Sequence, residues 1–195
     1  MRAGLELLGE EGWEGFTMAA ACRRAGVSMG MLYRRFANRD AFLSAVQDRW
    51  IADLEEAQQA FVGRPVAWEE LSFEEAVEVA VDGIVESIAA DERLLRTWAT
   101  HDALDDDGLA RLAGVARRNA AWFVAGLMRH RSAIAHPRAE RALELCFRLV
   151  LDMSVRRANY GDDFATGTSV GDWSVFAAEL RSIVIAYLRR SPTAA

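Results

Sequence analysis

Residues 25–36 read Ala-Gly-Val-Ser-Met-Gly-Met-Leu-Tyr-Arg-Arg-Phe, and this stretch decides the interpretation of the chain. Gly26 follows a segment with helical spacing, and the Ser28 side chain can cap a helix that begins at Met29. A short helix, a glycine-containing turn and a second short helix form a helix-turn-helix, which inserts its second helix into the DNA major groove. The stretch therefore predicts a DNA-binding helix-turn-helix.

The segments on either side of this turn also have helical patterns. Apolar residues recur at three- and four-residue intervals along nearly the whole chain, and no alternating run predicts a β-strand. The expected helices lie, with approximate ends, at 5–16, 18–24, 29–36, 38–61, 69–90, 91–101, 109–130, 135–159 and 172–190. We therefore expect an all-α fold of about nine helices.

Charge is unevenly distributed along the sequence. The net charge is −6, and all 23 basic residues are arginines. The first 49 residues carry seven arginines against six acids, and the remainder carries 16 arginines against 23 acids. Residues 15–39 contain five arginines and no acid. An acidic chain with one basic segment is not expected to coat nucleic acid indiscriminately, but it can bind DNA through that segment.

The basic segment supplies the groups that contact a phosphate backbone. Thr17 and Tyr33 can donate hydroxyl hydrogen bonds, and helix starts capped at Thr17, Ser28 and Asn38 leave N–H groups free for phosphates. The arginines that can neutralise phosphate charge are Arg23, Arg24, Arg34, Arg35 and Arg39. A merely solvated basic face is the alternative interpretation, and the adjacent turn and Tyr33 favour DNA contact.

Two stretches, Gly15-Phe16-Thr17-Met18 and the run from Ala25 to Leu43, follow a known family pattern. That pattern reads roughly Thr-x-x-x-Ile-Ala, then Ala-Gly-Val-Ser-x-Gly-x-Leu-Tyr-x-x-Phe, then Lys-Glu-x-Leu. The sequence thus resembles the N-terminal domain of the TetR family of bacterial transcriptional regulators. The resemblance is specific over about residues 15–45, and the rest of the chain is similar to the family only in its helical pattern.

The resemblance implies roles for individual residues. Thr17, Tyr33 and Arg39 would hold phosphates, with Arg39 in the family's lysine position. Ser28, Gly30, Met31 and Arg34 would lie at or near base edges, with Arg35 nearby, and Met29 is also predicted to belong to the DNA-binding set. Met29 and Met31 depart from the pattern, because the family often has lysine and threonine there. Arg34 or Arg35 could read a guanine, since a bidentate arginine–guanine pair is the commonest specific contact.

The rest of the chain is expected to dimerise and to bind an effector. We predict a DNA-binding domain at 1–45 and an effector-binding and dimerisation domain at 46–195, with the helix at 38–61 linking them. The last two helices are apolar on more than one face, which favours a homodimer through these helices over a plain core position. The resemblance then implies a repressor that binds a near-palindromic operator as a dimer and is released by a small molecule.

The middle helices carry the residues predicted to bind a small apolar or amphipathic effector. Aromatic side chains would form an apolar pocket, and a few polar groups would orient the ligand. The predicted effector-binding residues are Trp98, His101, Asn119, Trp122, Phe123, Phe147 and Arg148. Aromatic residues at helical spacing are more often plain core, so that alternative stays open at each position.

Other classes of protein find little support in the sequence. Gly26-Val27-Ser28-Met29-Gly30 fits the nucleophile elbow of hydrolases, but the residues before it read as helix rather than strand. The three histidines form no metal-ligand motif, and no glycine-rich phosphate loop is present, so no metal or cofactor is expected. Two isolated cysteines and no apolar span predict a cytoplasmic protein without a membrane segment. A helical-bundle enzyme and a helix-turn-helix that binds protein instead of DNA remain as alternatives.

Overall fold

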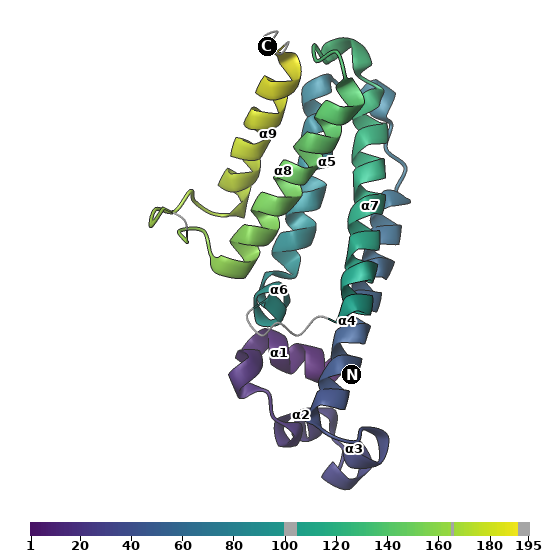
Figure 1. Ribbon diagram of the computed structural model, residues 1–195, viewed down its shortest axis with the longest axis vertical. Coiled ribbons are helices and arrows are strands. Elements are labelled where there is room, and N and C mark those ends of the chain that lie inside the picture. Colours follow the sequence, from purple (N-terminus) through teal and green to yellow (C-terminus); the bar gives the residue numbers. More distant parts are fainter. Residues whose placement is uncertain (100–104, 165, 191–195) are drawn as a thin grey trace. The chain divides into compact units, whose positions relative to one another are not determined.

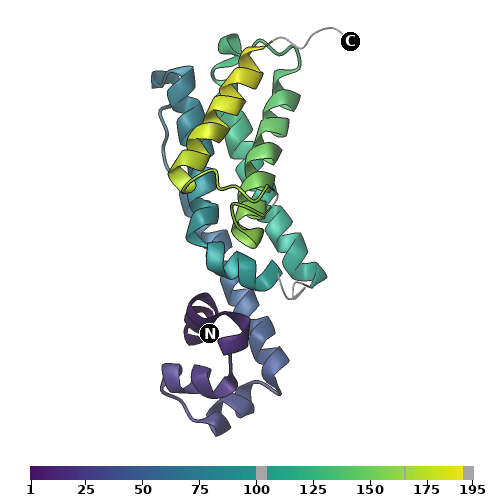
Figure 2. The same ribbon diagram turned by 90° about the vertical axis from the view of Figure 1, so that its left-hand side faces the viewer.

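The structure is a computed structural model that describes residues 1–99, 105–164 and 166–190. Within these residues all regular elements are helical, which confirms the predicted all-α class (Figures 1 and 2). The helices are α1 (Arg2–Gly15), α2 (Met18–Ala25), α3 (Met29–Arg35), α4 (Arg39–Val62), α5 (Phe73–Ala90), α6 (Glu92–Ala99), α7 (Asp106–Met128), α8 (Ala139–Tyr160) and α9 (Trp173–Arg189). Short 3-10 turns lie at Trp68–Glu70 and Arg131–Ala133.

Three helices differ from their expected limits for local reasons. Gly12 has a φ of 68°, which kinks α1 in its last turn. The helix expected from residue 69 begins at Phe73, because Ser72 and Glu75 form a reciprocal capping box. The helix expected from residue 135 begins at Ala139, since the Ala135 N–H instead donates to the carbonyl of Leu188 in α9.

The chain forms two compact units, and the first comprises Met1–Phe61 and Glu92–Val115. In this unit α1 packs against α2 and α6, and α2 packs against α3. Its core contains Leu8, Val46 and Ile51, all fully buried. Trp98 of α6 stacks on Trp50 of α4 with ring centroids 6.1 Å apart. Tryptophan packing therefore joins α6 to the N-terminal helices.

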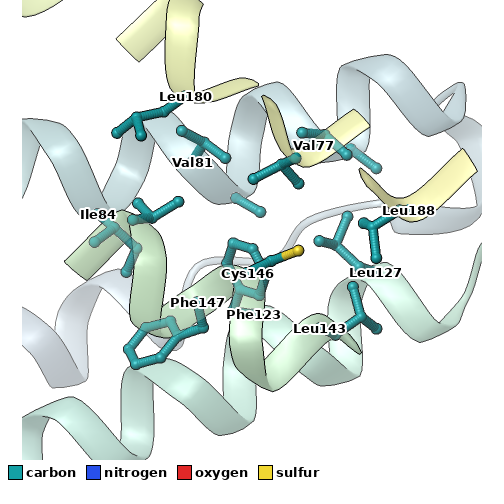
Figure 3. Packing of buried hydrophobic residues seen from close by; sticks show 14 of the residues in the cluster. Val77, Val81, Ile84, Phe123, Leu127, Leu143, Cys146, Phe147, Leu180 and Leu188 are labelled. Carbon is teal, nitrogen blue, oxygen red and sulfur yellow. The ribbon is translucent and has the colours of Figure 1, made fainter. Parts of the chain in front are cut away.

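The second unit comprises Val62–Asp91 and the chain from Ala116 onward. Here α5 packs against α8 and α9, and the buried side chains of these helices and α7 form one apolar cluster (Figure 3). The members at its centre are Val77, Val81, Ile84, Phe123, Leu127, Leu143, Cys146, Phe147, Leu180 and Leu188. Burial raises the pKa of the Cys146 thiol to about 12, so this cysteine is an apolar core residue at neutral pH.

Both predicted DNA-binding helices lie in the first unit, whereas α8 and α9 lie in the second. This division into packing units does not test the predicted boundary after residue 45 between a DNA-binding and an effector-binding domain, so that boundary stays a prediction. None of the helices, over the residues that the structure describes, has an apolar stretch long enough to cross a membrane.

Candidate nucleic-acid interface

Local hydrogen bonds define the turn between α2 and α3. The Thr17 hydroxyl accepts a hydrogen bond from the Ala20 N–H at 3.0 Å and caps α2. Gly26 ends α2 in the left-handed conformation, with a φ of 65°, which favours glycine. Ser28 then caps α3 by accepting from the Met31 N–H at 3.2 Å. The sequence therefore encodes this turn through two caps and one glycine.

Helix α3 is exposed along nearly its whole length. Leu32 is its one buried residue and anchors it to the core of the first unit. Met31 and Tyr33 are 51% and 50% exposed, which is unusual for large apolar side chains. A seven-residue helix that exposes a methionine and a tyrosine has the surface expected of a helix that docks against a partner.

Several arginines beside this helix have no carboxylate partner among the residues that the structure describes. We call Arg23, Arg34, Arg35 and Arg39 the α3 cluster; none of them forms an ion pair in the described chain. Arg24 is different, because its guanidinium donates to Glu10 at 2.6 Å. That hydrogen bond lowers the pKa of the Glu10 carboxyl. Arg24 is thus engaged within the protein, and the α3 cluster is available to phosphates.

Arg39 is held by aromatic rings at the start of α4. Its guanidinium lies 5.1 Å from the ring centroid of Trp13 and 5.7 Å from that of Phe16. The preceding residue, Asn38, accepts a hydrogen bond from the Ala41 N–H at 2.8 Å. Cation–π contacts orient a guanidinium without neutralising it, so Arg39 keeps its charge for an anion.

The structure brings the predicted DNA-binding residues together in the first unit. Ser28, Met29, Gly30 and Met31 occupy the exposed cap and first turn of α3, and a Cβ added at Gly30 would meet no atom within 4 Å. Thr17 sits at the start of α2. The individual roles of these residues in DNA contact stay predictions.

The predicted effector-binding residues are not brought together. Trp98 belongs to the core of the first unit, where it packs on Trp50 and against the edge of Trp13. Phe123 and Phe147 meet in the core of the second unit with centroids 5.8 Å apart. Arg148 is exposed on α8, and His101 lies outside the described residues. Among the described members, Trp98 thus belongs to the core of the first unit, Phe123 and Phe147 belong to the core of the second, and Arg148 is exposed.

One polar member of that set has a notable environment. The side-chain carbonyl oxygen of Asn119 in α7 is buried without a hydrogen-bond partner. Trp122, one turn further along α7, packs against Trp68 with centroids 5.1 Å apart. A buried acceptor without a donor is unfavourable by about 1–3 kcal/mol. The part of Asn119 in orienting a ligand stays a prediction.

A second group of arginines also lacks carboxylate partners in the described chain; sequence reasoning named Arg148 as an effector-binding residue and missed Arg138 and Arg141. We call Arg138, Arg141 and Arg148 the α8 cluster; all three are exposed. Their spacing puts them on one face of a helix, which was a signal available in the sequence. A charged helix face is usually only solvated, and the lack of opposing acids becomes visible only in the structure.

Comparisons with known proteins agree with this geometry. The family model of bacterial regulatory proteins of the tetR family matches residues 1–46, the part of the chain that holds the turn and α3. None of the curated proteins resembles the sequence closely enough to match.

Solved structures extend the likeness to the whole fold. A tetR-family regulatory protein from Rhodococcus RHA1 is 14% identical with a TM-score of 0.63, over 96% of this chain and 93% of that chain. Salmonella enterica GusR is 18% identical with a TM-score of 0.60, over 97% and 93%. The fatty acid degradation regulator FadR from Bacillus halodurans is 12% identical with a TM-score of 0.55, over 94% and 91%. At these identities the likeness concerns the fold.

The family model and the fold both favour a DNA-binding regulator among the classes of protein considered from the sequence. The model describes bacterial regulatory proteins rather than enzymes, in line with the prediction that the chain is not an enzyme. Residues 1–46 thus match the model of the tetR family of bacterial regulatory proteins, and the chain has the fold of a tetR-family regulatory protein over nearly its whole length.

Proposed function

We propose that the protein is a ligand-responsive repressor that binds a near-palindromic operator as a homodimer and leaves it when a small molecule binds. The observation that carries the proposal is the exposure of α3, together with four arginines on or beside it that form no ion pair with any residue that the structure describes. A helix that packs in a protein core buries several apolar side chains, whereas α3 buries Leu32 alone. Two such helices in a two-fold dimer would meet successive major grooves about 34–36 Å apart, or at a multiple of that spacing.

In this proposal the residues around α3 divide into two roles. Thr17, Tyr33 and Arg39 contact phosphates and fix the position of the helix on the duplex. Arg34 reads a base edge, with Arg35 beside it, while the slim turn at Ser28–Met31 allows close approach to the groove floor. Met29 and Met31 then offer thioether contacts where many relatives in the family have polar groups.

The exposed apolar residues of the second unit support dimerisation through α8 and α9. Between them these helices expose large apolar side chains at six positions: Leu145, Met153, Tyr160, Val175, Ile183 and Tyr187. We call these six residues the α8–α9 surface. Monomeric proteins rarely leave such a set open to water. A two-fold contact that pairs this surface with itself would bury it in both copies.

The effector, in this proposal, binds among the apolar residues of the second unit. Asn119 supplies a polar contact, and Trp122, Phe123 and Phe147 supply apolar walls. Helix α7 is continuous from the first unit, where Arg111 pairs with Glu55 at 2.8 Å, to these residues. A ligand that shifts α7 would change operator affinity through a coupling free energy of about 1–3 kcal/mol.

Selection of bound fragments from the source genome tests the proposal directly. The full chain is mixed with sheared genomic DNA, and retained fragments are sequenced and checked by fluorescence anisotropy. We expect a shared near-palindromic site and an affinity that falls steeply with salt, because phosphate contacts release counterions. Arg34→Ala should alter the base preference, whereas Arg39→Ala should weaken all sites alike.

Two outcomes would contradict the proposal. Absence of binding to any fragment even at low salt would favour the alternative that the helix-turn-helix contacts protein. Salt-independent binding, or wild-type affinity and preference in both variants, would remove the assigned contacts. Light scattering on the same sample should give about twice the chain mass of 21.6 kDa.

A further inference from the structure

The α8 cluster stands apart from other arginines of the second unit. Arg181 pairs with Glu78 and Asp82 at 2.8 and 2.9 Å, and Arg157 pairs with Asp162. No carboxylate of the described chain lies within 4.0 Å of the charged nitrogens of Arg138, Arg141 or Arg148. In a protein with a net charge of −6, such a gathering of uncompensated positive charge requires an explanation.

These three arginines surround one hollow. A pocket of about 340 Å³ lies between the start of α8 and the end of α9. Its lining comprises His136, Arg138, Arg141, Ala142, Glu144, Leu145, Arg148 and Tyr187. Three arginines and one glutamate thus line a single concave site.

Two hydrogen bonds and one ring contact fix the shape of this pocket. The Ala135 N–H donates to the Leu188 carbonyl at 2.9 Å, which ties the segment before α8 to α9. His136 accepts a hydrogen bond at its Nδ1 atom from the Arg138 N–H at 3.1 Å. The His136 ring lies 5.9 Å from the ring of Tyr187. These hydrogen bonds and the ring contact, rather than contacts of the guanidinium groups, therefore fix the walls of the pocket.

We propose that this pocket binds a small organic anion, whose carboxylate or phosphate group is held by Arg138, Arg141 and Arg148. Planar guanidinium groups form paired, charge-assisted hydrogen bonds to these two anion types. Leu145 and Tyr187 supply an apolar wall for the carbon skeleton of such a ligand. The site shares no residue with the proposed operator contacts; it shares Arg148 with the effector-binding residues predicted from the sequence, and Leu145 and Tyr187 with the α8–α9 surface.

The shape of the site favours a small anion over a polyanion. All three arginines line the same concave surface, which suits a ligand with a few charges close together. Glu144 in the lining and the exposed Glu140 beside it would repel an extended phosphate backbone. Leu145 and Tyr187 also belong to the α8–α9 surface, so a carboxylate of a second copy is the competing occupant that the test must separate.

Isothermal titration of the full chain with citrate, against sodium chloride of equal ionic strength, tests the proposal. The test variant is R138Q/R141Q/R148Q, and the matched control is R23Q/R34Q/R35Q, which removes the same number of charges from the α3 cluster. We expect one citrate per chain in the wild type and in the control. The test variant should bind citrate at least about 100-fold more weakly, because charge-assisted hydrogen bonds are lost. Inorganic phosphate as a second probe shows whether the carbon skeleton contributes, since it should then bind more weakly than citrate.

Three outcomes would overturn the proposal. Equal citrate binding by the test and control variants would mean nonspecific attraction to arginines. No saturable binding of citrate or phosphate to the wild type would mean that the pocket does not take anions. Loss of the dimer in the test variant, with no citrate binding to the wild-type dimer, would assign the arginines to the second copy. Circular dichroism of both variants checks that these exposed substitutions leave the fold intact.

Discussion

The α3 cluster and the α8 cluster have the same chemistry and different settings. Both consist of arginines without carboxylate partners in the described chain, next to exposed apolar side chains. The α3 cluster lies on and beside a seven-residue helix in which Leu32 is the one buried residue. The α8 cluster lines a pocket of about 340 Å³ between two long helices. Positive charge on an exposed helix suits the groove of a nucleic-acid polymer, whereas positive charge that lines a pocket suits a small anion.

The largest expected effect comes from replacing three of the four arginines of the α3 cluster and measuring DNA binding. R23Q/R34Q/R35Q should weaken binding to a selected operator fragment about 1000-fold, because three charged contacts are lost. The slope of log affinity against log salt should also become shallower by about two to three. Fluorescence anisotropy at several salt concentrations measures both quantities.

R138Q/R141Q/R148Q is the matched control for this experiment, since it changes the net charge equally. Its operator affinity should stay within about threefold of wild type, and its salt slope should be unchanged. If both variants lost affinity alike, overall charge rather than position would govern DNA binding, and the distinction between the two clusters would fail.

A second effect should separate the apolar side chains that accompany each cluster. Ile183 is 45% exposed on α9, and the proposed dimer would bury it. Ile183→Glu would place a charge in that contact and should raise the dimer dissociation constant about 100-fold or more. Analytical ultracentrifugation should then show the single-chain mass at concentrations where the wild type is dimeric.

Leu109→Glu provides the comparison for Ile183→Glu. Leu109 is 52% exposed on α7 and lies outside the α8–α9 surface. The same charge introduced there should leave the dimer intact. A dimer in both variants would show that α9 does not form the contact, and monomers in both would indicate a general loss of structure.

The α3 region was predictable from sequence because its determinants are local. Thr17, Gly26 and Ser28 act within four residues of their own positions, so their types and spacing suffice to predict the turn. The exposure of α3 followed from a single anchoring residue, Leu32. The residues that determine the predicted DNA-binding surface therefore lie in one short segment of the sequence.

The remaining sites depend on contacts between distant segments. The sequence predicts Trp98 as an effector-binding residue. The spacing of aromatic residues, however, gives no information about which side chain Trp98 packs against. In the structure Trp98 packs on Trp50, some 48 residues away in sequence. The sequence likewise predicts Arg24 as a phosphate ligand. Its ion pair with Glu10 could not be predicted, because it depends on the packing of α1 against α2. The α8 pocket likewise exists only because the segment before α8 is tied to α9.

The smallest expected effect compares one glycine from each region. In the second unit, a Cβ at Gly126 would lie 2.5–2.7 Å from ring atoms of Trp68, which itself packs on Trp122. Gly126→Ala should therefore lower the free energy of unfolding by about 1–2 kcal/mol, since overpacking outweighs the gain in helix propensity. Gly30→Ala on α3 meets no atom and should raise it by up to about 1 kcal/mol.

Urea unfolding followed by circular dichroism measures both glycine variants, and operator titration adds the decisive comparison. If Gly30 lets the backbone approach the groove floor, Gly30→Ala will be more stable than wild type and yet bind the operator more weakly. Gly126→Ala should show the opposite combination, with lower stability and unchanged affinity at temperatures where it is folded. An increase in both stability and affinity in Gly30→Ala would mean that the first turn of α3 stays clear of the DNA, and α3 would then lose its place as the reading helix.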